Sequence, residues 1–178
     1  WPGLEFLHRV NSGDPPSIGP NVLVIGGGDV AMAAARCALR IDGVKSVHVA
    51  CLESREEMPA HSWELSEALE EGIVLHNSLG PTKIENGAVT FRVCTSVFDE
   101  NKRFNPRFDD AKTSVLKADT VIVTIGQGIE SAGLGVATAG GGRIAADRDT
   151  LATSVPGVFA GGDAVLGPAA MVDAMAQG

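Results

Sequence analysis

The sequence predicts an α/β fold with a mostly parallel central sheet, a three-stranded antiparallel meander on one face and helices on the other. Between residues 21 and 75, short apolar runs of strand length alternate with segments in which apolar residues recur every three or four positions. The pattern changes to strict alternation at 89–93, after an Asn-Gly turn. With 22 glycines and only 4% aromatic residues, the chain is expected to have many tight turns and a core of small aliphatic side chains.

The first half of the chain consists of strands and helices in alternation. Each expected strand is a short apolar run, and each expected helix has an apolar face and a breaker such as glycine after it. A linker rich in proline and glycine follows the first helix. The expected elements are, in order, a helix at 1–10, a strand at 21–25, a helix at 30–41, a strand at 47–52, a helix from Ser62 to Leu69 and a strand at 73–75.

The second half interrupts this order with an antiparallel meander, because alternating apolar residues replace the helical pattern. The polar segment 99–110 contains Asn105-Pro106 and is expected to be a solvated loop between two meander strands. The expected strands are, in order, 83–84, 89–93 and 113–117 in the meander, 121–125 in the parallel sheet and 142–145 in a glycine-rich stretch, before a final helix at 169–176.

Composition and charge exclude several classes of function. Fourteen basic against 22 acidic side chains give a net charge of −8, which disfavours nucleic-acid binding and binding to an anionic membrane surface. Cys37, Cys51 and Cys94 are widely spaced with no CxxC pair, so neither a disulfide framework nor a metal site is indicated. No apolar run reaches membrane-spanning length, and no signal peptide is recognisable. A cytoplasmic protein without membrane insertion, nucleic-acid partner or bound metal is therefore expected.

The strand at 21–25 opens directly into the turn Gly26-Gly27-Gly28-Asp29-Val30-Ala31, which begins a helix. Gly26 allows a sharp corner, Gly28 lets the backbone approach a diphosphate, and Ala31 keeps the helix close to the sheet. Unpaired backbone amides between Gly26 and Val30 would hold the diphosphate. We therefore predict dinucleotide binding at this turn; the alternative is a plain structural corner.

An acidic residue, Glu53, ends the next expected strand at the spacing of a ribose-binding carboxylate. It would accept hydrogen bonds from the ribose hydroxyls and repel a 2′-phosphate, which favours NAD over NADP. The alternative is a solvated surface glutamate. Arg55 follows on the same loop and is expected either to stack on adenine or to pair with Glu56 or Glu57. His61 also lies at the ligand end of the sheet, but no carboxylate or cysteine is expected beside it, so it is assigned no acid–base role.

Several motifs together resemble a known family. A single nucleotide turn, a meander in place of a crossover helix, a strand ending in Thr-Ile-Gly-Gln and the run Val-Pro-Gly-Val-Phe-Ala-Gly-Gly-Asp are similar to the two-dinucleotide-domain flavoproteins. More closely, the chain resembles the small (β) subunit of glutamate synthase and its relatives, the iron–sulfur-associated pyridine nucleotide-disulfide oxidoreductases. The segments that carry the likeness are Phe6 to Asn11, Gly26 to Arg36, Ser54 to Ala60, Ala118 to Gln127 and Thr153 to Gly178.

This resemblance implies a Rossmann-like FAD/NAD(P)-binding fold and a division of the chain into three parts. Residues 1–20 would be a lead-in helix and linker, 21–128 an NAD-binding domain, and 129–178 the returning segment of an FAD-binding domain. By the same resemblance, the nucleotide site also includes Gly126 and Gln127.

Gly162 and Asp163 would contribute to an FAD site, again by resemblance to the family. The structural alternative for Asp163 is a cap on the helix that follows it. FAD is therefore expected in the full-length parent protein, whereas this chain reads as a fragment that neither retains FAD nor is active alone.

The function that the resemblance implies is hydride transfer between NAD(H) and FAD, with electrons exchanged with an iron–sulfur or other electron-transfer subunit. Because the cofactors carry this chemistry, no catalytic side chain is expected. One alternative is a nucleotide-binding regulatory or interaction module without turnover. Another is a simple α/β fold whose glycine turn binds nothing.

Two positions depart from the family pattern. Asp29 stands where asparagine is usual, and a carboxylate near a diphosphate lowers affinity by like-charge repulsion. Leu52 and Glu53 stand where members that use NADPH usually carry two arginines, which would clamp the 2′-phosphate. The second departure supports NAD as the nucleotide, with NADP less favoured.

Overall fold

The computed structural model describes residues 1–131, 133–169 and 171–177. The chain divides into two compact units, Trp1–Gly126 and Gln127–Gly178. Across the described ranges, no helix is long and apolar enough to cross a membrane.

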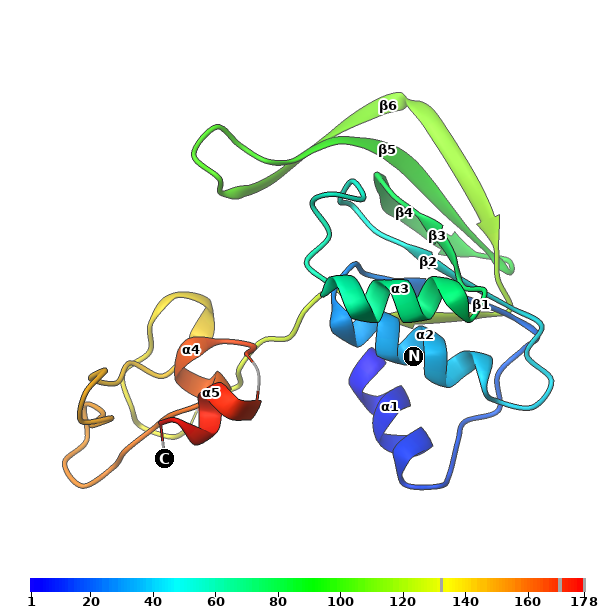
Figure 1. Ribbon diagram of the computed structural model, residues 1–178. Coiled ribbons are helices and arrows are strands. Elements are labelled where there is room, and N and C mark those ends of the chain that lie inside the picture. The colour runs from blue at the N-terminus through cyan, green and yellow to red at the C-terminus, as the bar shows by residue number, and fades with distance from the viewer. Residues whose placement is uncertain (132, 170, 178) are drawn as a thin grey trace. The chain divides into compact units, whose positions relative to one another are not determined.

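A four-stranded parallel sheet is the centre of the first unit (Figure 1). Its strands are β1 (Asn21–Ile25), β2 (Ser46–Ala50), β3 (Val74–His76) and β7 (Thr120–Val123). They lie in the order β3-β2-β1-β7, and every neighbouring pair is parallel. The central strand β1 is buried from its second residue to its last, as expected of a parallel sheet that is covered on both faces. The predicted parallel sheet is confirmed.

Three helices cover one face of this sheet: α1 (Gly3–Asn11), α2 (Asp29–Leu39) and α3 (Ser62–Glu70) (Figure 1). Helix α2 turns a stripe of alanines toward the strands, and small side chains let the helix axis come close to the sheet. The stripe consists of Ala31, Ala34, Ala35 and Ala38, all fully buried. Phe6 of α1 is fully buried in the same core. The amino end of α2 is thereby held firmly against the end of β1.

The antiparallel meander covers the other face of the parallel sheet (Figure 1). Its strands are β4 (Leu79–Glu85), β5 (Ala88–Phe98) and β6 (Phe104–Lys117), in that order. Asn86 and Gly87 have positive φ angles of 49° and 72° and form the hairpin turn between β4 and β5. The two sheets share a core made of Leu23, Ile25, Ala50, Val89, Phe91 and Ala118. The predicted meander is confirmed.

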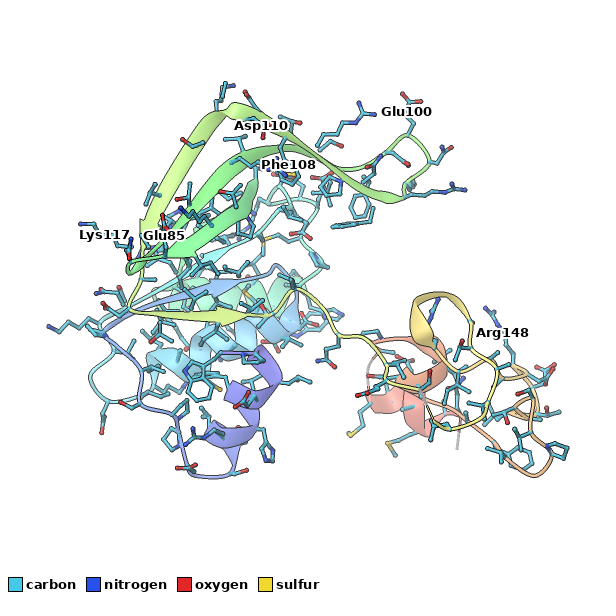
Figure 2. The ribbon with its side chains drawn as sticks, turned by 180° about the vertical axis from the view of Figure 1, so that it is seen from behind. Glu85, Glu100, Phe108, Asp110, Lys117 and Arg148 are labelled. Carbon is cyan, nitrogen blue, oxygen red and sulfur yellow. The ribbon has the colours of Figure 1, made fainter. Side chains whose placement is uncertain are left out.

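The β5–β6 hairpin is longer than the sequence pattern indicates. The expectation of a solvated loop over 99–110 is confirmed for 99–103 and wrong for the rest, because β6 already begins at Phe104. Phe98 and Phe104 pack edge to face with ring centroids 6.4 Å apart, and Glu100 lies at the tip beyond them (Figure 2). Pro106 is tolerated in β6 because an edge strand does not need every backbone amide. Register shifts between β5 and β6 break the alternation that would have predicted these strands.

The second unit contains little regular structure. The short strand expected at 142–145 is wrong: among the described residues this stretch forms only an isolated bridge, between Thr138 and Ile144. Two positive φ angles of 76°, at Gly141 and Gly142, interrupt an extended strand there. The helical segments of this unit are a 3₁₀ turn at Gly140–Gly142, α4 (Asp163–Leu166) and α5 (Met171–Met175). Helix α5 is shorter than the helix predicted at 169–176, of which residue 170 lies outside the described residues.

Candidate nucleotide-binding site

The glycine turn lies where β1 ends, at the carboxyl edge of the parallel sheet. Gly26 has a φ of 144°, which residues with side chains rarely adopt, and its amide donates to the carbonyl of Ala50 at 2.9 Å. A Cβ at Gly26 would collide with the hydroxyl and the carbonyl of Thr124, which follows β7. Position 26 therefore requires glycine both for its backbone angle and for the approach of the neighbouring strand.

The next residues present a row of free backbone donors. Gly28 is the N-cap of α2, and its carbonyl accepts from Ala31 and Met32. The amides of Gly27, Gly28, Asp29 and Val30 donate to no acceptor within the described part of the chain. A Cβ built at Gly28 would meet nothing closer than Pro59 Cγ at 3.9 Å, so the space beside Gly28 is open. Free amides at a helix amino end, with open space beside Gly28, suit a diphosphate.

The Asp29 carboxylate points to the start of α3. Its Oδ1 accepts from the His61 amide at 2.7 Å, and its Oδ2 lies 2.6 Å from His61 Nδ1. The Ala60 amide also donates to the carbonyl of Gly27 at 3.1 Å. The expectation that His61 has no carboxylate beside it is wrong, because a contact between residues 32 positions apart leaves no local sequence signal. These three contacts fasten the loop after β2 to the glycine turn.

Glu53 lies on that loop, and its carboxylate sits over the turn. A Cβ built at Gly27 would lie 2.7 Å from Glu53 Oε2 and 3.1 Å from the Cβ of Cys51. The residue is half-buried rather than fully exposed, and its contact with a ribose stays a prediction. No cation within the described ranges pairs with this carboxylate. The site thus combines a turn with free backbone amides and a nearby carboxylate that pairs with no described cation.

Residues 6–178 match the family described as pyridine nucleotide-disulphide oxidoreductase. The chain belongs to this family. Three curated relatives show how far the likeness extends. NADP(+)-dependent formate dehydrogenase subunit beta of Moorella thermoacetica is 41% identical over 99% of this chain and 26% of its own length. NADPH-Fe(3+) oxidoreductase subunit beta of Geobacter sulfurreducens is 32% identical over 96% of this chain and 30% of its own. Glutamate synthase [NADPH] small chain of Azospirillum brasilense is 30% identical over 98% of this chain and 38% of its own length.

Solved structures agree on the fold of this family member. Thioredoxin reductase of T. acidophilum superimposes with a TM-score of 0.71 at 21% identity, covering 94% of this chain and 50% of that one. FprA of Mycobacterium tuberculosis in complex with NADPH superimposes with a TM-score of 0.77 at 14% identity, and the match covers 96% of this chain and 54% of FprA. The predicted family and the FAD/NAD(P)-binding fold are therefore confirmed. This chain spans only about a quarter to two fifths of the three curated relatives named above.

Although the family name refers to disulfides, the three cysteines of this member are free thiols. Burial, and after it the nearby Glu53 charge, raise the pKa of Cys51 to about 12. Burial also raises the pKa of Cys94. Thiols held in the protonated form are weak nucleophiles. Across the described residues, no group of three or more His, Cys, Asp or Glu side chains is placed to hold a metal ion.

The remaining predicted site residues divide between the two units. Gly126 follows β7 with a φ of 107°, at the same sheet edge as the glycine turn, because β7 pairs with β1. Arg55 is exposed and forms no ion pair with any described residue, so the predicted alternative of pairing with Glu56 or Glu57 is wrong. Gln127 begins the second unit.

Gly162 and Asp163 lie in the second unit, at the start of α4. Gly162 is the N-cap residue, with a φ of 64°, and its amide donates to Gln177 Oε1 at 2.7 Å. Asp163 is the first helical residue, and no side-chain capping bond is present. The alternative that Asp163 caps the helix is therefore wrong. A contact of Asp163 with FAD stays a prediction.

Proposed function

We propose that the chain is the pyridine-nucleotide-binding portion of a flavoprotein oxidoreductase that transfers hydride between NAD(H) and FAD. The observation that carries the proposal is the set of four free amides between Gly27 and Val30, open to an anion and bordered by the Glu53 carboxylate. The amides would hold the diphosphate, and Glu53 would accept from the ribose hydroxyls. The nicotinamide and flavin rings supply the redox chemistry itself. The protein side chains bind and orient the nucleotide, and none is needed as a nucleophile.

An electron-transfer subunit would complete the reaction in the whole protein. The relatives from Moorella and Geobacter are named as beta subunits of oxidoreductases, and the relative from Azospirillum as a small chain. Such names support a subunit that passes electrons between a pyridine nucleotide and a partner. By the family resemblance, the partner we propose is an iron–sulfur or similar electron-transfer subunit, and FAD would be held with the help of Gly162 and Asp163.

We further propose that NADH is preferred to NADPH, although the three named relatives carry NADP or NADPH in their names. A 2′-phosphate carries close to two negative charges, and its oxygens would approach Glu53. Two unit charges about 4 Å apart cost about 4 kcal/mol at an effective dielectric of about 20. Even a quarter of this repulsion changes affinity about five-fold. Leu52 offers no compensating cation, because it is apolar and packs against Gly80 of the meander.

Calorimetric titration of NADH and NADPH, at two salt concentrations, tests the preference. The unmodified protein should bind NADH more tightly, and the double substitution Leu52→Arg with Glu53→Arg should narrow or reverse the ratio by replacing repulsion with a phosphate clamp. The matched control is Glu70→Gln, which removes one negative charge from an exposed position on α3. Equal or tighter binding of NADPH by the unmodified protein contradicts the proposed preference. An unmodified protein that binds neither NADH nor NADPH contradicts the proposed function as a whole.

A further inference from the structure

We propose that Asn77 is a positioning residue for coenzyme selectivity, because it fixes the part of the backbone that aims Glu53 at the ribose. The inference rests on the proposed function and names a residue on a different strand from the glycine turn and from Glu53. Asn77 directly follows β3, the neighbour of β2 in the sheet. It is half-buried, and its side chain points back to the loop that carries Glu53.

The contacts converge on one carbonyl group. Asn77 Nδ2 donates to the Glu53 carbonyl at 3.1 Å and to Cys51 Sγ at 3.4 Å. The Ser78 amide donates to the same carbonyl at 3.0 Å, and the Cys51 thiol lies 3.6 Å from it. Because β2 ends at Ala50, no strand ladder holds Glu53 in place. The residues that follow β3 take over this role.

The backbone at Ser78 is arranged for these contacts. Ser78 has a φ of 58°, a left-handed conformation that is uncommon for a residue with a side chain. Immediately after it, the Leu79 amide donates to the Cys51 carbonyl at 2.8 Å, and the Ser78 carbonyl accepts from Cys94 at 2.8 Å. An unfavourable backbone angle persists where surrounding contacts enforce it. The turn from β3 to β4 therefore fixes the loop after β2 through backbone hydrogen bonds.

The position of the Glu53 carboxylate follows from this backbone. With its own carbonyl fixed, Glu53 directs its Oε2 over Gly27, to within 2.7 Å of where a Cβ would stand. Loss of the Asn77 donor leaves that carbonyl with weaker support and allows the side chain to move away from the turn. NADH should lose a ribose contact, whereas NADPH should lose a repulsion. The two nucleotides should therefore respond in opposite directions, which a general loss of stability does not produce.

The test is a double-mutant cycle read by titration of NADH and NADPH. In Asn77→Ala the ratio of the NADPH to the NADH dissociation constant should fall about three- to five-fold, the effect of one hydrogen bond. In a Glu53→Ala background, which removes both the charge and the acceptor, the same substitution should leave the ratio unchanged, because Asn77 acts through the Glu53 side chain. Asn77→Leu, which keeps the branched shape but has no donor, should behave like Asn77→Ala and serves if the alanine variant does not fold. The matched control is Asn21→Ala, whose amide binds Asp119 at the amino end of β1.

An equal loss of affinity for both nucleotides, with the ratio unchanged, overturns the inference and leaves the proposed function standing. A change in the ratio that persists in the Glu53→Ala background also overturns it, since Asn77 then does not act through the Glu53 side chain. An unmodified protein that binds neither nucleotide overturns both proposals. Melting temperatures measured without nucleotide separate loss of fold from loss of selectivity.

Discussion

Replacing Gly28 with valine should abolish nucleotide binding while the protein remains folded. The backbone at Gly28 has φ −97° and ψ −179°, an extended conformation that a branched residue adopts without strain. Its Cβ would find Pro59 Cγ at 3.9 Å and nothing closer. No side-chain cap is lost, because glycine has none. Valine is a poorer N-cap than glycine, which destabilises the protein, but it also makes the unfolded chain less flexible, which stabilises it. Because these effects oppose each other, the free energy of unfolding should change by no more than about 1 kcal/mol.

The loss of binding should be much larger than the loss of stability. The valine side chain would fill the space in front of the free amides of Gly27 to Val30, where the diphosphate should rest. A hydrogen bond to a charged group contributes about 1.5–3 kcal/mol. Blocking two of these hydrogen bonds should lower the affinity for NADH at least about 100-fold.

Titration calorimetry with NADH, beside a denaturant unfolding curve, measures both quantities on one preparation. Gly140→Val is a suitable control, because a Cβ at Gly140 meets no atom within 4 Å and its φ is not in the left-handed region. Unchanged affinity in Gly28→Val would show that the turn is only a structural corner. A variant that is unfolded would show that the fold itself requires glycine at this position, contrary to the extended backbone angles of Gly28.

Two further outcomes follow from burial. Phe6→Ala should lower the free energy of unfolding by about 3–5 kcal/mol, because Phe6 is fully buried. Leu4→Ala, on the exposed side of the same helix, should change it little. Denaturant unfolding curves compare the two variants, and similar losses of stability would contradict the assigned packing of α1. Cys51 in the folded protein should react slowly with iodoacetamide at pH 8, because burial and the Glu53 charge raise its pKa to about 12. Mass spectrometry of the labelled protein, with the unfolded chain as reference, checks this, and rapid labelling of folded protein would show that the thiol is accessible.

Local sequence pattern predicted the parts of the fold that repeat at short range. The apolar run of β1, the apolar face of α2 and the Asn86-Gly87 hairpin are each encoded within a few residues, and each was placed correctly. The start of β6 at Phe104 was missed because register shifts and polar residues hide a two-residue period. Phe104 and Phe108 are four positions apart among polar residues, a spacing that fits the two-residue period of a strand and could have indicated β6.

Only part of the candidate site is predictable from the sequence, for a similar reason. The glycine turn and Glu53 have characteristic spacing, so their positions were predictable from residue types alone. The contacts of Asp29 with His61 and of Asn77 with Glu53 join residues that are distant in sequence, and no periodicity marks them. Ordinary polar residues acquire a role at this site through the order of strands in the sheet.

The closeness of Glu53 to Gly27 also limits the routes by which this site can change. A Cβ at position 27 would lie 2.7 Å from Glu53 Oε2 and 3.1 Å from the Cβ of Cys51, so the glutamate side chain and the end of β2 both leave it little room. Substitutions at 27 and 53 are consequently not independent. Alanine at 27 should be harmful while glutamate is present and better tolerated once residue 53 points elsewhere. A change at residue 53 therefore relieves the shorter of the two contacts at position 27, and a side chain at position 27 would in turn displace a glutamate at 53 from the turn.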